Sequence, residues 1–260
     1  MLLSKLHPLF AVAIGFCLAL PSREAPARRQ SGVHAVVDAR SGMLFGGTAN
    51  GRWIDAEHLA PRINGNERYH LYGFSRSLGE SMGSKPGPLV PNCGSPEIDL
   101  KLAKSNALVG IAGNWNALPR IPRQESITQA VYHQAVRDFL RQRGVRTPQF
   151  SITQIVRCDL DGNDQDEVLI CVDQVTPSQE QSCLLLLRKI VRGRVRTISI
   201  ATARPYHLPS TTRLVALLDV NGDGRMEIIT ETHIPDGVSQ EIWQVDGIEP
   251  RVVLNWGCGV

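Results

Sequence analysis

The sequence predicts a mainly β protein with one substantial helix, in which antiparallel sheets make up a C-terminal unit of two repeats. Three observations support this fold class: eight short apolar runs after Gln149, a single amphipathic segment before them, and a pattern of acidic residues that occurs twice. The chain of 260 residues is 42% hydrophobic, which is enough for a sizeable core. Its formal net charge is only +3, so the overall composition gives no electrostatic reason to bind nucleic acid or an anionic membrane.

Residues 1–27 have the features of a secretory signal segment. Lys5 supplies a positive charge, residues 9–20 form an apolar run, and residues 25–27 (Ala-Pro-Ala) offer a small-x-small cleavage site. Because this apolar run is too short to span a bilayer, cleavage is favoured over an uncleaved N-terminal anchor. We therefore expect a secreted protein, periplasmic or extracellular.

Export would place the mature chain in an oxidising compartment, where cysteines form disulfides. Cys171 and Cys183 lie on successive apolar runs, which makes a bridge across that hairpin plausible, although spacing alone does not determine the connectivity. The sequence has no Cys-x-x-Cys pair, which argues against zinc and thioredoxin-like chemistry. An odd number of cysteines follows the signal segment, so at least one is left without an internal partner: Cys93, Cys158, Cys171, Cys183 and Cys258.

Residues 28–122 form an N-terminal β-rich region to which the sequence assigns no role. Its apolar segments are short and punctuated by glycine, and residues 55–60 favour a helical turn. The stretch from Gly79 to Pro96 is rich in Gly, Ser and Pro, which predicts an irregular loop. Four aromatic residues are candidates for a ligand platform or, more commonly, for the core of a small β unit: Trp53, Tyr69, Tyr72 and Trp115.

Residues 123–146 are predicted to contain the helix and its connection. Ser126 and Gln129 have the spacing of a capping box, and Gly144 can adopt the left-handed conformation that ends a helix. Apolar residues recur at steps of four, which predicts the apolar face of the helix: Ile127, Val131, Ala135 and Phe139, flanked by Tyr132, Val136 and Leu140.

The β domain predicted for residues 147–260 contains the eight apolar runs. Turn residues separate the runs, and their short, regular spacing favours antiparallel sheets. The expected strands lie near residues 150–158, 167–173, 183–191, 195–201, 213–218, 226–231, 241–245 and 251–255.

Two loops of matching sequence are the strongest functional signal. The first copy spans residues 159–167 (DLDGNDQDE) and the second spans residues 219–227 (DVNGDGRME). Oxygen-bearing side chains recur at loop positions 1, 3, 5 and 9, with glycine at position 4, which suits the ligand preference of Ca²⁺ and the turn of a tight loop. An EF-hand would need an acid at position 12, where Ile170 and Thr230 stand instead.

The D-x-[DN]-G-[ND]-x-x-x-E pattern, entered and left by strands, resembles the FG-GAP repeats of integrin α-subunit-like β-propellers. The resemblance covers roughly residues 150–258 and implies up to two Ca²⁺ ions, each in a loop between two strands. A full seven-bladed propeller is excluded, because seven such repeats need more residues than the chain has. Asp164 stands at position 6, where the family usually has glycine, which predicts strain in the first loop. The implied ligands, with the position-7 residues acting through their main chain only, are Asp159, Asp161, Asn163, Gln165 and Glu167, and Asp219, Asn221, Asp223, Arg225 and Glu227.

The favoured function is that of an exported calcium-binding, non-catalytic β-repeat protein with a binding or structural role. Its partner would be a protein or carbohydrate surface, with no nucleic acid and no stable membrane insertion after signal cleavage. The alternative is a secreted hydrolase with a carboxylate- or histidine-based site near His70, His207 or His233. The carboxylates cluster in the two loops, where a metal ligand is not free to act as an acid or base.

Overall fold

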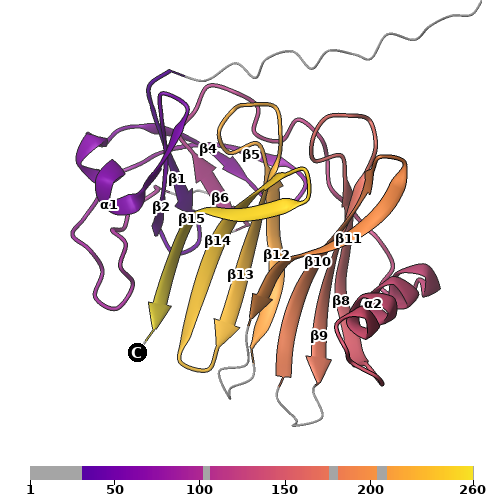
Figure 1. Ribbon diagram of the computed structural model, residues 1–260. Coiled ribbons are helices and arrows are strands. Elements are labelled where there is room, and N and C mark those ends of the chain that lie inside the picture. Colours follow the sequence, from indigo (N-terminus) through magenta and orange to yellow (C-terminus); the bar gives the residue numbers. More distant parts are fainter. Residues whose placement is uncertain (1–30, 102–105, 176–180, 204–209, 260) are drawn as a thin grey trace, which may run out of the picture.

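The predicted fold class is confirmed by the computed structural model, in which antiparallel strands dominate and form three open sheets (Figure 1). Among the residues that it describes, no helix is long and apolar enough to cross a membrane. The predicted signal segment, residues 1–27, lies outside these residues. The described residues are 31–101, 106–175, 181–203 and 210–259.

A six-stranded sheet forms the N-terminal part, with the strand order β3-β2-β1-β6-β4-β5. The helical turn predicted near its third strand is present as α1 (Ala56–Leu59), where the Asp55 carboxylate accepts a 2.9 Å hydrogen bond from the backbone N–H of His58. The irregular loop predicted from Gly79 starts later than expected, because the last strand continues to Met82. The strands are β1 (Val33–Asp38), β2 (Leu44–Ala49), β3 (Arg52–Asp55), β4 (Arg68–Tyr72), β5 (Ser77–Met82) and β6 (Val109–Ile111), and a short 3-10 helix covers Ala60–Arg62.

All eight strands predicted after Gln149 are present, and they form two four-stranded antiparallel meanders. In each meander an acidic loop joins the first strand to the second. The short strand β7 (Arg123–Gln124) adds to the edge of the first meander. The first meander contains β8 (Gln149–Cys158), β9 (Glu167–Val175), β10 (Gln181–Val191) and β11 (Arg194–Ala203), and the second contains β12 (Thr211–Leu218), β13 (Glu227–Ile234), β14 (Gly237–Asp246) and β15 (Glu249–Gly259).

The second meander lies between the other two sheets. Strand β15 contacts β2 and β3, whereas β12 contacts β9 and β10 (Figure 1). The main cluster of buried apolar side chains draws on all three sheets, with Phe45, Leu185 and Leu217 as members. Since burying one such side chain stabilises a fold by roughly 1.5–3 kcal/mol, this shared core holds the sheets together. Tyr69 and Tyr72 are also buried, as expected for core residues.

The amphipathic helix is present as α2 (Ala130–Gln142), but two predicted details of it are wrong. The helix begins after Gln129 without a side-chain cap, because the Ser126 hydroxyl bonds to Thr128 instead. Ile127 precedes the helix and is exposed. The buried face is centred on the predicted flanking residues and consists of Tyr132, Val136, Phe139 and Leu140, whereas Val131 is exposed. The predicted stop at Gly144 is confirmed by its left-handed φ of 89°.

The disulfide suggested between Cys171 and Cys183 is absent, and both residues are free and buried. The reason is the register of β9 and β10, which places Cys171 opposite Leu185 and Cys183 opposite Asp173. A disulfide joins Cys93 to Cys258 instead, across 165 residues of sequence. It ties the loop after β5 to β15, and so fastens the N-terminal part to the C-terminal meander.

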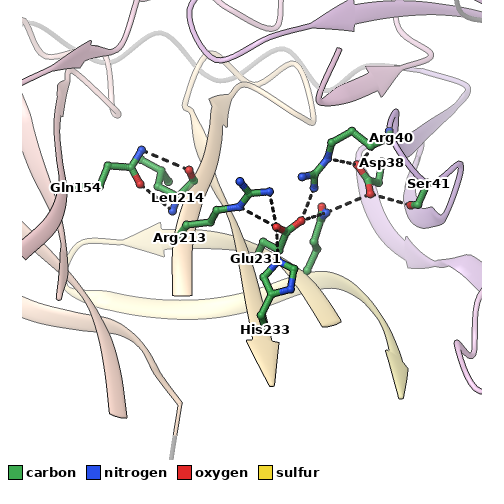
Figure 2. A network of polar contacts seen from close by, with 9 residues as sticks. Asp38, Arg40, Ser41, Gln154, Arg213, Leu214, Glu231 and His233 are labelled. Atoms are coloured by element: carbon green, nitrogen blue, oxygen red, sulfur yellow. Dashed lines mark hydrogen bonds and ion pairs between the residues drawn. The ribbon is translucent and has the colours of Figure 1, made fainter. Parts of the chain in front are cut away.

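A buried polar network also joins these two parts of the chain (Figure 2). Asp38 at the end of β1 and Glu231 on β13 are both ion-paired to Arg40. The Gln240 amide nitrogen donates to both carboxylates, at 3.1 Å and 2.8 Å. Arg213 pairs with the second oxygen of Glu231, at 2.7 Å from its Nε. Each buried carboxylate is thus matched by cationic or amide donors.

Burial alone would raise the pKa of Glu231, but the hydrogen bonds from Arg40 and His233 and the arginine charges lower it to about 2. A carboxyl whose folded pKa is depressed from 4.5 stabilises the fold above that pH by roughly 3 kcal/mol, and the effect disappears as the pH falls toward 2. Glu231→Gln should therefore cost most stability near pH 7 and progressively less between pH 4.5 and pH 2. Urea unfolding followed by circular dichroism over this range measures the difference. The exposed substitution Glu57→Gln is the control, and a Glu231→Gln cost that does not change with pH would contradict the account.

Candidate metal centre

The first acidic loop, residues 159–167, folds around the carboxylate of Asp159. One oxygen of Asp159 accepts the backbone N–H groups of Gly162 and Asn163, at 2.7 Å and 3.1 Å, and the other accepts that of Asp164 at 3.0 Å. Glu167 at position 9 accepts the N–H of Leu160 at position 2, at 2.8 Å. These bonds satisfy the backbone donors of a tight turn and hold the acidic side chains together.

The second loop, residues 219–227, repeats the same hydrogen bonds at the same positions. The two oxygens of Asp219 accept the N–H groups of Asp223 and Gly224, at 3.0 Å and 2.9 Å. Glu227 accepts the N–H of Val220 at 2.8 Å. The sequence repeat is therefore also a repeat in backbone conformation.

Positions 4 and 6 are left-handed in both loops. Gly162 and Gly222 have φ of 79° and 73°, and Gly224 at position 6 has φ of 88°. Asp164 occupies the equivalent position in the first loop with φ of 63°. An L-residue other than glycine is strained there, as the sequence predicted for this loop.

The position-9 glutamates close both loops from the first residue of the following strand, and both are buried. Burial raises the pKa of Glu167, and it raises the pKa of Glu227 well above its usual range. Burial likewise raises the pKa of Asp219 to about 6. Since burial disfavours the charged form of these acids, a cation close to their oxygens would be stabilising.

Three carboxylates of the first loop meet in a cluster that could hold a metal ion. One oxygen each from Asp159, Asp161 and Glu167 lie within 4.8 Å of one another. The main chains of the position-7 residues stay in their loops, where the N–H of Gln165 bonds to Asn163 and that of Arg225 bonds to Asp223, at 2.8 Å and 2.9 Å. In the second loop the Asn221 amide contacts the Asp223 carboxylate at 3.1 Å. The Arg225 side chain leaves its loop to contact Asp246 and the carbonyl of Val245.

The two loops differ in a lysine that sequence inspection missed. Lys189 on β10 places its Nζ 3.2 Å from Asp161 and 3.7 Å from Glu167, so it already supplies a positive charge to the first loop. By strand register, the equivalent position in the second meander is the neutral Gln244. Among the described residues, no Lys, Arg or His lies within ion-pair distance of the acids of the second loop. Its carboxylates therefore have backbone N–H donors but no ion-pair partner among the described residues.

An arginine that the sequence did not single out joins the two loops. Arg120 donates to the carbonyls of Asp159 and Leu160 in the first loop and, at 2.8 Å, to that of Gly224 in the second. The backbone N–H of Met226 also donates to the carbonyl of Leu160 at 2.8 Å. Because both loops contact the same guanidinium, they form one continuous centre.

Two of the three histidines proposed for a hydrolase contact glutamates in the structure. His70 contacts Glu80 at 3.4 Å, His233 bonds to Glu231 in the network of Figure 2, and His207 lies outside the described residues. In a groove of about 450 Å³ beside β8 and β12, the Gln154 amide is bonded to the backbone of Leu214. No substrate-directed group is apparent there.

The sequence also contains a serine motif typical of hydrolases, which our sequence analysis did not identify. Residues 79–83 (Gly-Glu-Ser-Met-Gly) spell G-x-S-x-G, which in hydrolases presents a nucleophile at a strand-to-helix turn. Here Ser81 is a buried residue within β5, and its hydroxyl donates to the carbonyl of Lys101 at 3.0 Å. The geometry of a nucleophile elbow is not present.

Relief of the strain at Asp164 should stabilise the fold. Asp164→Gly is expected to raise the unfolding free energy in chelator by roughly 0.5–1 kcal/mol, because glycine adopts the left-handed conformation freely. Gly224→Asp, the reverse change at the equivalent position, should destabilise. Asp164→Asn removes the charge but keeps a side chain, so a gain from Asn as large as that from Gly would contradict the strain account. Chemical denaturation of the four proteins measures these differences.

Comparison of the chain with protein-family models, with curated proteins and with solved structures gives no match. The resemblance to FG-GAP repeats therefore rests on the loop pattern alone. The chemistry of the centre has to be inferred from its own residues.

Proposed function

We propose that this is an exported, calcium-binding, non-catalytic β-repeat protein with a binding or structural role, related in its loops to FG-GAP repeats. One observation carries the proposal: two loops with the same carboxylate-to-backbone hydrogen bonds hold buried acids whose charge is only partly neutralised. Nothing in ordinary Asp/Asn/Gly turns requires the position-9 acid to be buried.

Ca²⁺ fits this donor set better than softer metals do. Carboxylate, amide and carbonyl oxygens are the ligands of a hard cation, and a flexible loop tolerates the six to eight ligands that Ca²⁺ takes. The proposed side-chain ligands are those at positions 1, 3, 5 and 9, with the position-7 carbonyl in addition. They are Asp159, Asp161, Asn163, Gln165 and Glu167 in the first loop and Asp219, Asn221, Asp223, Arg225 and Glu227 in the second.

The two sites are unequal in this proposal. Lys189 competes with a cation in the first loop, whereas no described cationic side chain is ion-paired with the acids of the second loop. The second loop should therefore fill at lower Ca²⁺ concentration, even though the first has more acids.

Calcium would have a structural role in this protein, by stabilising the fold. The loops lie where the two meanders meet and contact Arg120 together, so an ion in either loop would also fix the packing of the sheets. Extracellular calcium modules bind with Kd of about 10⁻⁴–10⁻³ M, and an ion at 100 times its Kd stabilises a fold by about 2.7 kcal/mol. The disulfide between Cys93 and Cys258 supports an oxidising compartment for such a role.

Calcium should raise the melting temperature, and a chelator should lower it. Glu227→Gln keeps an oxygen for the N–H of Val220 but removes the charge at position 9, so it should abolish most of the shift. Thermal unfolding in Ca²⁺, in Mg²⁺ and in chelator measures the effect. Glu57→Gln, the same change at an exposed site, should keep the full response. A melting temperature that Ca²⁺ leaves unchanged in the wild-type protein would refute the proposal.

Replacing the lysine should strengthen the first site. Lys189→Met in the Glu227→Gln background removes the competing ammonium, so the Ca²⁺ affinity of the first loop should rise by about tenfold or more. Isothermal titration calorimetry measures the affinity directly. Lys85→Met, which changes an exposed lysine in the same background, should have no effect. Equal affinities for the two lysine variants would mean that Lys189 does not compete with the ion.

A further inference from the structure

The hairpin of β10 and β11 carries a concentration of arginines close to its turn. Arg192, Arg194 and Arg196 are exposed, and Arg188 is half-buried. Arg192 and Gly193 form the turn itself with φ of 51° and 71°, and the strands stay paired up to Val191 and Arg194. A two-residue turn of this type suits a tight hairpin, so the backbone positions that carry these arginines lie close together.

Among the described residues, no acidic side chain lies within ion-pair distance of these arginines. Elsewhere in the described chain, Arg40, Arg123 and Arg225 are each paired with a carboxylate. None of the four hairpin arginines has an ion pair with a described residue. Since unpaired guanidinium groups bind phosphate oxygens strongly and in a two-pronged manner, they indicate an anionic ligand outside the chain.

A groove of about 820 Å³ is lined by residues of this hairpin and of the turn between β14 and β15. None of the described residues that line it is acidic or aromatic. Asp246 of the second hairpin does not neutralise the groove, because Arg225 and Arg251 already pair with it, at 3.4 Å and 3.6 Å. The main lining residues are Val191, Arg192, Arg194, Arg196, Ile198 and Ile248.

Exposed aliphatic side chains also lie near both turns, and on the first hairpin they occupy the face opposite to Arg194 and Arg196. Ile190 and Val195 form a cross-strand pair and are 50% and 57% exposed, and Ile248 at the neighbouring turn is 49% exposed. Proteins that bind single-stranded nucleic acid stack its bases on aromatic residues, which this groove lacks. A hairpin end with arginines on one face and exposed aliphatic residues on the other instead matches the interface of an anionic membrane, where phosphates and acyl chains meet.

We propose that the tips of these two hairpins bind the surface of an anionic phospholipid membrane, with the arginines on the phosphates and the aliphatic residues in the interface. The near-neutral composition of the chain conceals this site, because the charges of other regions cancel. This contact is peripheral and does not rest on the calcium proposal.

Cosedimentation with lipid vesicles tests the proposal. The probe is the chain from residue 28 onward, which contains every described residue and lacks the apolar signal segment that would itself bind lipid. It should bind vesicles containing phosphatidylglycerol, release them at high salt, and ignore vesicles of phosphatidylcholine alone. Each arginine near the surface adds to the attraction between the protein and the anionic lipid. The variant Arg192→Asn, Arg194→Ser, Arg196→Ser should therefore bind these vesicles roughly 100-fold more weakly than wild type.

Two further variants separate this site from general charge and from misfolding. The triple variant Arg52→Ser, Arg62→Ser, Arg146→Ser changes net charge equally at exposed positions elsewhere and should bind like wild type. Ile190→Thr with Val195→Thr should weaken binding while keeping its salt dependence, and unchanged melting temperatures show that the variants fold. Wild-type protein that stays in the supernatant, or a hairpin triple variant that binds like the control, would overturn the proposal. So would binding of tripolyphosphate in solution without any cosedimentation, which would identify a soluble anion as the ligand.

Discussion

Burial of carboxylates in two adjoining loops is the constraint on which this structure depends. Glu167 and Glu227 are each the first residue of a strand, and each bonds back to the second residue of its loop. They fix where the first strand of a meander ends and where the second begins. Arg120 then joins the loops, which sets how the meanders pack. Because burying these charges is costly, a cation bound at the loops would stabilise the fold.

The N-terminal sheet is fastened to this unit by independent means. The network around Glu231 matches its charges with arginines, and the Cys93–Cys258 disulfide closes a long stretch of chain. These links lie away from the acidic loops, so removal of an ion should loosen the meander interface without detaching the sheet. The proposed membrane contact lies on the same hairpin as Lys189, whose cross-strand partner is Arg196, so it adjoins the first acidic loop.

Local signals made much of the fold predictable. Alternating apolar runs and turn residues located the eight strands, and the acidic repeat located both loops, including the strained Asp164. Features that depend on tertiary register could not be predicted. Cys93 forms a disulfide with Cys258 because β15 lies beside the loop after β5. Lys189 contacts the first loop because of its pairing position on β10. The helix stripe was misassigned because its N-terminus lies three residues later than the apparent cap at Ser126.

The central claim is that both acidic loops are calcium sites of unequal strength. Crystals grown in Ca²⁺ and measured at a wavelength with anomalous scattering from calcium test it most directly. The account predicts a peak in each loop, with higher occupancy at the second and with Lys189 displaced from Asp161 wherever the first is filled. Loops without an anomalous peak at millimolar Ca²⁺, with Lys189 still in contact with Asp161, would contradict it.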